Sequence, residues 1–258
     1  MASYGGDFVW YELLTTDPEA AKTFYQKVVG WETQDWEQGP MKYTMWKAGD
    51  AMIGGVMLLP DRARAAGAPP HWLGHVGTPD IEASFAKMTS LGGMSYVPPT
   101  DIPSVGRYAV FADPQGAALA MYQSATPESG PPATGPGTIG WNELMTTDLD
   151  AGVSFYERLF GWNKIQAMDM GEMGIYQMYG KGDRMLGGMM KCPPGVSQPF
   201  WLYYITVPDI SDALSRVKSN GGQVMNGPME VPGGGQVAQC FDPQGAAFAL
   251  YQEGPPQA

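Results

Sequence analysis

The chain has 258 residues, enough for two ordinary domains, and 44% of them are hydrophobic, which suffices for real cores. Its formal net charge of -11 and its pI of about 4.5 argue against nucleic acid or an anionic membrane as a partner. No apolar run is long enough to span a membrane, and the N-terminus lacks the basic and apolar regions of a signal peptide. Cys192 and Cys240 have no metal-type or redox spacing, so we expect a cytoplasmic protein.

The first quarter of the chain reads as a strand, a helix and further short strands. A strand is predicted over 8–15, and Asp17 then suits a helix N-cap, with Pro18 at the first helical position. The helix is expected to stop at Gly30. Strand-like runs follow in the joining segment and near 42–47 and 51–58.

The second quarter repeats this plan. A strand is predicted over 72–78, and Asp80 caps a helix that ends at Gly92-Gly93. Three more strands are expected, over 94–97, 106–112 and 117–123.

The second half of the chain repeats the first. The segment 8–31 returns as 139–162, with Thr-Thr-Asp and Phe-Tyr…Gly-Trp in both copies, and 111–123 returns as 241–252 around Asp-Pro-Gln-Gly. Asp-Pro-x-Gly suits a type I turn, so each copy predicts a hairpin. The predicted order is βαβββ, four times over, in an α+β fold whose paired units curl around a partly open cavity. The expected domains are 1–123 and 138–258, joined by a linker over 124–137.

These repeated motifs resemble the glyoxalase/bleomycin-resistance/extradiol-dioxygenase superfamily, also called vicinal oxygen chelate. The resemblance covers nearly the whole chain. It implies two homologous glyoxalase-like domains with curved mixed sheets around a cavity. It does not fix an activity, because one fold hosts many chemistries.

The resemblance also implies where metal ligands would lie, on the first and last strand of each βαβββ unit. No residue at these places supplies an oxygen, nitrogen or thiolate side-chain donor. The places are Trp10, Leu73, Trp141, Leu202, Ala120 and Ala249, with Gly54 and Gly187 in the remaining two units. We therefore predict no cofactor. A divalent metal stays open through one unusual set, Glu12, His71 and His75.

Glu12 and Glu143 are the candidate acidic groups. Each lies two residues after a vacant ligand place, and the period-two alternation of a strand puts it on the same, cavity-facing side. In a catalytic reading either carboxylate is a general base, with a pKa raised by an apolar wall. The alternative is a carboxylate that bonds a backbone group or lies at the cavity mouth.

Aromatic residues recur in both halves and are predicted to line the cavities. An aromatic wall with one carboxylate suits a flat organic molecule, whereas core packing is the alternative for any single ring. With Glu12 and Glu143, the predicted ligand-binding residues are Trp10, Trp72, Tyr122, Trp141, Trp201 and Tyr251.

The sequence thus predicts a monomer or homodimer that binds an aromatic or apolar metabolite or antibiotic, without metal. The first alternative is an enzyme of the superfamily, a lyase, isomerase, hydroxylase-like protein or dioxygenase, using the unusual metal set or Glu12/Glu143 as base. The second is a partner-binding or structural protein whose own side chains fill its cavities.

Overall fold

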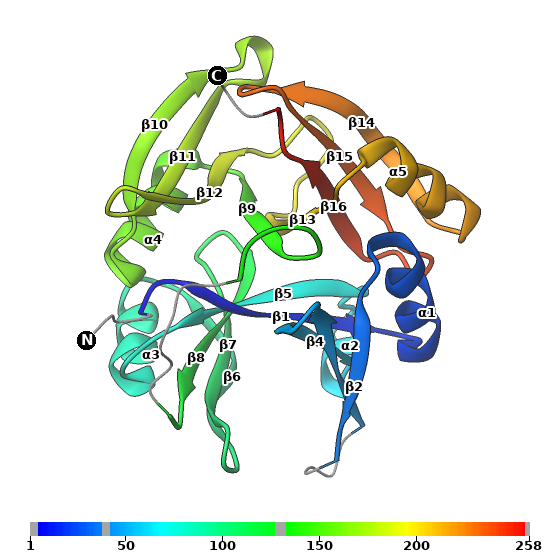
Figure 1. Cartoon of the computed structure of the whole chain (residues 1–258). Coiled ribbons are helices and arrows are strands. Elements are labelled where there is room, and N and C mark those ends of the chain that lie inside the picture. The colour runs from blue at the N-terminus through cyan, green and yellow to red at the C-terminus, as the bar shows by residue number, and fades with distance from the viewer. Residues whose placement is uncertain (1–4, 38–41, 127–132, 256–258) are drawn as a thin grey trace. The chain divides into compact units, whose positions relative to one another are not determined.

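The computed structural model describes residues 5–37, 42–126 and 133–255 (Figure 1). Residues 127–132 of the linker expected over 124–137 lie outside these residues. The secondary-structure elements follow the βαβββ order four times, as the repeats predict, and we call these the first to fourth motifs. Among the described residues no helix is long and apolar enough to cross a membrane.

The first and second motifs supply the following elements: β1 (Phe8–Thr15), α1 (Pro18–Val29), β2 (Glu32–Trp36), β3 (Tyr43–Ala48), β4 (Ala51–Leu58), α2 (Asp61–Ala65), β5 (His71–Gly77), α3 (Ile81–Ser90), β6 (Met94–Ile102), β7 (Gly106–Ala112) and β8 (Ala118–Ser124). The third and fourth motifs supply the following: β9 (Ile139–Thr146), α4 (Leu149–Phe160), β10 (Asn163–Asp169), the 3-10 turn η1 (Gly171–Met173), β11 (Ile175–Lys181), β12 (Arg184–Lys191), β13 (Phe200–Thr206), α5 (Ile210–Ser219), β14 (Gln223–Val231), β15 (Gly235–Phe241) and β16 (Ala247–Gln252). The short elements α2 and η1 were not expected, and β6 runs past its predicted end.

Local chemistry explains where the longer helices begin. The side chain of Asp17 accepts a hydrogen bond from Ala20 N at 3.0 Å, which satisfies one of the unpaired N–H groups of the first turn. Helix α1 ends at Gly30, which adopts a left-handed conformation with φ of 77°. The other three long helices also begin after a capping aspartate, namely Asp80, which was predicted, Asp148 and Asp209.

The strands form two mixed sheets of eight, one from each half of the chain. Their orders are β2-β3-β4-β1-β5-β8-β7-β6 and β10-β11-β12-β9-β13-β16-β15-β14. Within each half the first strand of a motif runs parallel to the last, as for β1 with β4 and β5 with β8, while neighbours such as β3 and β4 or β7 and β8 are antiparallel. The α+β architecture of two homologous domains is therefore confirmed.

The Asp-Pro-Gln-Gly segments make the predicted turns. Gly116 N donates to Asp113 O at 3.0 Å, and the Asp113 Oδ1 atom accepts from the backbone N–H groups of Gln115, Gly116 and Ala117 at 2.8 to 3.0 Å. Asp242 accepts in the same way in the second half. A buried carboxylate thus organises each hairpin.

Contacts divide the chain into two compact units, and each unit takes residues from both halves of the sequence. Unit 1 holds Met1–Trp10, Leu73–Pro132 and Trp141–Trp201, so it combines most of the second and third motifs. Unit 2 holds Tyr11–Trp72, Ala133–Gly140 and Leu202–Ala258, which are most of the first and fourth motifs. Each hydrophobic core is therefore shared between the two sequence halves.

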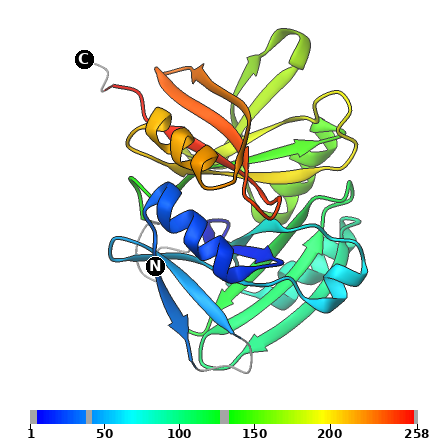
Figure 2. The same ribbon diagram turned by 90° about the vertical axis from the view of Figure 1, so that its right-hand side faces the viewer.

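The core of unit 2 is built around Tyr25 of α1. This helix lies beside α5, and Arg216 donates from Nε to Val28 O at 3.1 Å (Figure 2). The Tyr25 ring is fully buried and contacts the rings of Trp31, Trp46, Trp72 and Phe248. Its Oη accepts a hydrogen bond from Trp72 Nε1 at 2.9 Å and donates to Asp242 Oδ2 at 3.3 Å.

The core of unit 1 repeats this arrangement around Tyr156 of α4. Trp201 Nε1 donates to Tyr156 Oη at 3.2 Å, and Tyr156 donates to Asp113 Oδ2 at 3.1 Å. In each unit a Trp–Tyr–Asp chain therefore joins the Phe-Tyr helix of one half to the Asp-Pro-Gln-Gly turn of the other. Burial raises the pKa of both Asp113 and Asp242, against the hydrogen bonds that lower it.

Candidate functional site

A second kind of tryptophan–tyrosine–carboxylate chain lies in unit 1, on strands β9 and β11. Tyr176 Oη donates to Glu143 Oε1 at 2.8 Å, and Trp141 Nε1 donates to Tyr176 Oη at 2.8 Å. Glu143 is buried, whereas Trp141 and Tyr176 are half-buried. The hydrogen bonds hold the carboxylate in one place on the sheet.

Gly188 leaves the space that the hydrogen-bond chain of Trp141, Tyr176 and Glu143 needs. Gly188 of β12 lies beside Glu143 in the parallel register of β9 and β12. A Cβ on Gly188 would overlap the Tyr176 ring. The absent side chain therefore lets the phenol lie across β12 and reach the carboxylate.

The surroundings of Glu143 are apolar and rich in methionine. Because side chains alternate along a strand, Met145 and Met178 share the face of Glu143 and Tyr176. Met190 lies opposite Met145 on this face, and these three methionines are at most 9% exposed. We call Trp141, Glu143, Tyr176 and the three methionines the Glu143 wall.

Unit 2 carries the matching arrangement around Glu12. Gly55 of β4 lies beside Glu12 of β1, and a Cβ on Gly55 would overlap the Tyr43 hydroxyl. Tyr43 is hydrogen-bonded to the Glu12 side chain. Met45 pairs with Gly55 and Leu14 pairs with Met57, which brings apolar side chains to the same face. We call Glu12, Tyr43, Met45, Leu14 and Met57 the Glu12 wall.

Glu12 has a strongly shifted acidity. Burial raises its pKa from 4.5 to about 7, although the hydrogen bond with Tyr43 acts in the opposite direction. The residue as a whole is half-buried. The carboxyl group therefore changes charge near neutral pH, which a surface glutamate does not do.

The structure brings together some of the predicted site residues. Trp141 and Glu143 are linked through Tyr176, and Trp10 is half-buried two residues before Glu12 on the same strand. Tyr122 is also half-buried, but its hydroxyl donates to Val105 O at 3.0 Å, at the β6–β7 turn.

Tyr251, which repeats Tyr122, is half-buried as well. Burial raises its pKa above the ordinary value, and the negative charge of Glu253 adds to this shift.

Trp72 and Trp201 lie elsewhere than expected. Both indoles are buried and donate to the core tyrosines Tyr25 and Tyr156. Each tryptophan directly precedes a vacant ligand place, Leu73 or Leu202, so the alternation of the strand turns it to the opposite, helix-covered face. Their expected cavity-facing orientation was wrong.

The residues present do not fit the metal that the superfamily implies. Across 5–37, 42–126 and 133–255, no group of three or more His, Cys, Asp or Glu is placed to hold a metal ion. The alternative metal site at Glu12, His71 and His75 is therefore not supported. His71 Nδ1 is 2.7 Å from the backbone oxygen of Pro69.

Sequence reasoning missed Tyr43 and Tyr176, the partners of the two glutamates. A signal for them exists, because Tyr43-x-Met45 returns as Tyr176-x-Met178 at the same distance before the Gly-Gly pair of each half. The glycine pairs were read only as places where a metal ligand was missing. The second glycine of each pair, Gly55 or Gly188, leaves space for a tyrosine ring, whereas the first lies against a backbone carbonyl of the neighbouring strand.

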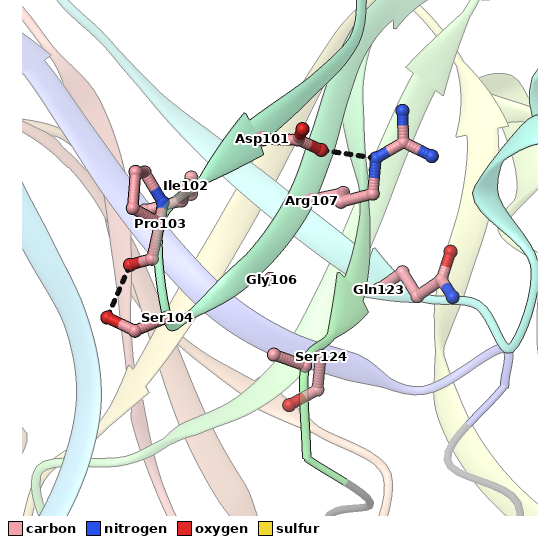
Figure 3. Close-up of a pocket in the computed structure, with 9 residues that line it drawn as sticks. Asp101, Ile102, Pro103, Ser104, Gly106, Arg107, Gln123 and Ser124 are labelled. Atoms are coloured by element: carbon pink, nitrogen blue, oxygen red, sulfur yellow. Dashed lines mark hydrogen bonds and ion pairs between the residues drawn. The ribbon is translucent and has the colours of Figure 1, made fainter.

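A pocket of about 460 Å³ lies at the end of the β6–β7 hairpin (Figure 3). Asp101, Ser104, Arg107 and Gln123 are among the residues that line it. Arg107 donates from Nε to Asp101 Oδ1 at 2.6 Å and pairs with Glu82 at 2.9 Å. Two carboxylates therefore already neutralise the cation in this pocket.

The order of the elements defines a class of protein that is built from paired βαβββ motifs. The chain belongs to the Glyoxalase/Bleomycin resistance protein/Dioxygenase superfamily, which matches residues 7–121 and 138–250. It is 32% identical over 251 residues to the "Putative glyoxylase CFP32" of Mycobacterium tuberculosis, covering 96% of this chain and 95% of the relative. It is 29% identical over 264 residues to the anthracycline biosynthesis protein DnrV of Streptomyces peucetius, covering 96% and 94%.

Solved structures of low sequence identity share the fold. One is 2,2',3-trihydroxybiphenyl 1,2-dioxygenase from Sphingomonas wittichii strain RW1, with a TM-score of 0.65 and 13% identity, covering 96% of this chain and 90% of that chain. Another is the Mn(II)-bound glyoxalase from Novosphingobium aromaticivorans, with a TM-score of 0.63 and 15% identity, covering 98% and 83%. At this identity the likeness describes the fold alone.

Proposed function

We propose that this protein binds an aromatic or apolar small molecule, a metabolite or an antibiotic, at the Glu143 wall and the Glu12 wall. One observation carries the proposal: the Trp141–Tyr176–Glu143 hydrogen-bond chain on a methionine-lined sheet face. The Glu12–Tyr43 pair repeats its core in the other half. A structural role alone does not require a half-buried tryptophan and tyrosine to hold a buried carboxylate.

The side chains of the walls suit a flat ring system. Methionine sulfur contacts with aromatic rings contribute about 0.3–1.5 kcal/mol each, and methionine adapts its shape to irregular ligands. A tryptophan ring adds a large, rigid stacking surface. Met145, Met178 and Trp141 would supply these contacts on the Glu143 wall.

The relatives support a polycyclic aromatic ligand. The Streptomyces protein DnrV is named for anthracycline biosynthesis, and anthracyclines contain a planar anthraquinone. The family name also includes bleomycin resistance, which is compatible with sequestering an antibiotic. Cys192 and Cys240 are free thiols, which is compatible with a cytoplasmic location.

Replacement of Trp141 by alanine tests this proposal. The probe is a soluble anthraquinone, and its affinity is measured by calorimetry for the wild type, Trp141→Ala and Tyr96→Ala. Tyr96 is an exposed aromatic residue on β6 and serves as the control. We expect Trp141→Ala to weaken binding about tenfold or more, which is about 1.4 kcal/mol, and Tyr96→Ala to leave it unchanged. Equal affinity of all three proteins would contradict the proposal.

One observation favours an enzyme as the second candidate. A glutamate whose pKa is about 7 is suited to act as a general base near neutral pH, and Glu12 has this property. In this reading Glu12, and Glu143 in the other half, would abstract a proton from a bound substrate in a lyase or isomerase reaction. Tyr43 and Tyr176 would position the carboxylates.

Isosteric substitution separates the two candidates. Glu12→Gln with Glu143→Gln keeps the shape of both walls and removes both bases. If the protein is an enzyme of this kind, turnover of a substrate should fall by about 100-fold or more while the substrate still binds. Unchanged turnover in the double variant would rule out the base role.

A further inference from the structure

Each wall presents one acidic group within a mainly apolar surface. On the Glu143 wall the carboxylate is surrounded by Met145, Met178, Met190 and Trp141. On the Glu12 wall it lies among Leu14, Met45 and Met57. Glu143 is only 4% exposed, so a ligand that covers the half-buried Trp141 and Tyr176 completes the removal of its carboxylate from water. A ligand on the Glu12 wall does the same for the half-buried Glu12.

The cost of that desolvation depends on the charge of the ligand. Covering a carboxylate with a neutral or anionic surface is unfavourable, because a buried charge needs an opposite charge or strong hydrogen-bond donors. A cation placed against the carboxylate offsets this cost through a charge-assisted hydrogen bond. The walls therefore discriminate between ligands of the same shape by their charge.

Tyr43 and Tyr176 strengthen this discrimination. Each phenol hydrogen-bonds to the carboxylate, at 2.8 Å for Tyr176 and Glu143, and so fixes the carboxylate position before a ligand arrives. Trp141 in turn donates to Tyr176, so the indole N–H is directed at the protein. A tryptophan ring attracts cations to its face, which adds to the same preference.

We propose that the ligand of the two walls is a planar aromatic cation that carries a charged N–H donor on its ring system. The ring system lies on the methionines and the tryptophan, and the charged N–H group meets Glu143 or Glu12. The formal net charge of -11 favours the approach of such a cation over that of an anion of the same shape. This inference rests on the proposed binding function and adds the chemical class of the ligand.

Three ring systems of the same size and different charge test the inference. They are 9-aminoacridine, which is a cation at neutral pH, acridone, which is neutral, and acridine-9-carboxylate, which is an anion. Affinities are measured by fluorescence titration at about pH 8, where Glu12 is ionised. The proteins are the wild type, Glu12→Gln, Glu12→Gln with Glu143→Gln, and the control Glu172→Gln, an exposed glutamate of η1.

The expected order of affinity in the wild type is cation, neutral molecule, anion, with about tenfold or more between the first two. The double variant should reduce that ratio to about twofold or less, and Glu172→Gln should leave it unchanged. Thermal unfolding confirms that each variant is folded. If the double variant does not fold, Glu12→Gln alone reports on its wall, since Glu12 is half-buried.

Three other outcomes have different meanings. Equal binding of the three ring systems to the wild type would overturn the inference about charge, and the proposed aromatic-binding function would remain. Binding of none of them would overturn both. Tighter binding of the cation that persists in the double variant would assign the preference to another acidic surface and so overturn the inference.

Discussion

The same three side-chain types form hydrogen-bond chains in two different places in this molecule. On the helix-covered side, Trp201 donates to Tyr156, which donates to Asp113. On the other face of the sheet, Trp141 donates to Tyr176, which donates to Glu143.

The difference between the two chains lies in their connections and exposure. The chain through Tyr156 is fully buried and joins a helix of one half to a turn of the other. The chain through Tyr176 stays within the third motif, and its tryptophan and tyrosine are half-buried. The chemistry of a hydrogen-bond chain therefore does not tell whether it is structural, whereas its position relative to the packed face does.

The largest effect is expected from the structural chain. Asp113→Ala leaves the Tyr156 hydroxyl and three backbone N–H groups of the turn without their acceptor. We expect the free energy of unfolding to fall by about 2–4 kcal/mol, because each unsatisfied buried group costs about 1–3 kcal/mol and water reaches part of the turn. Urea denaturation measures this change. The exposed Asp183→Ala variant is the control. If the free energy of unfolding falls no more in Asp113→Ala than in the control, the hydrogen bonds through Tyr156 and Asp113 do not stabilise the contact between the two sequence halves.

The next effect concerns pH and the Glu12 wall. Because the pKa of Glu12 is raised from 4.5 to about 7, the folded protein retains a proton that the unfolded chain releases in this window. The unfolding free energy of the wild type, relative to Glu12→Gln, should therefore fall as the pH rises through the window, by up to about 3 kcal/mol, and then level off. Denaturant titrations at several pH values check this. A difference that is constant across the window would contradict a buried Glu12.

A smaller effect is expected from adding a methyl group between strand and phenol. Gly188→Ala places a Cβ where the Tyr176 ring lies, and we expect a loss of about 1–3 kcal/mol from overpacking, with weaker ligand binding. A double-mutant cycle with Tyr176→Ala isolates the clash. The cost of Gly188→Ala should largely disappear in the Tyr176→Ala background. An unchanged cost in the Tyr176→Ala background would mean that position 188 requires glycine for its backbone and not because of the Tyr176 ring.

The smallest effect compares the β6–β7 turn with its repeat. Ser104 has a φ of 61°, a left-handed conformation, whereas the repeat has Gly233 with a φ of 95°. Ser104→Gly should raise the free energy of unfolding by less than about 1 kcal/mol, since relief of strain is partly offset by the flexibility of glycine in the unfolded chain. Thermal unfolding measures it. A clear destabilisation would indicate that the serine side chain is needed in the turn.

Much of the fold could be predicted because local sequence motifs that occur in both halves determine where its helices begin and end. Capping aspartates such as Asp17 mark where helices begin, and Gly30 marks an end. The sharing of each core between the halves was not predictable, because Tyr25 and Asp242 are far apart in the sequence and no local pattern pairs them.

The candidate site was less predictable, because some strands are buried on both faces. His71–Gly77 is half-buried or buried at every position, so burial itself does not alternate, and Trp72 was assigned to the wrong face. Glu12 and Glu143 were placed by strand alternation, two residues after ligand places that the family resemblance implies. Their tyrosine partners were not predicted. They lie on other strands, and the pairing register of a sheet cannot be read from sequence spacing alone.

Methionine methyl NMR tests the central claim most directly, because Met189 and Met190 are neighbours on opposite faces of β12. Met190 lies on the Glu143 wall with Met145 and Met178, whereas Met189 is 1% exposed and lies on the opposite face. On titration with 9-aminoacridine, the account predicts chemical-shift changes at Met145, Met178 and Met190 and little change at Met189. Binding that leaves the three wall methyls unmoved, or that shifts Met189 most, would contradict a ligand site at the Glu143 wall.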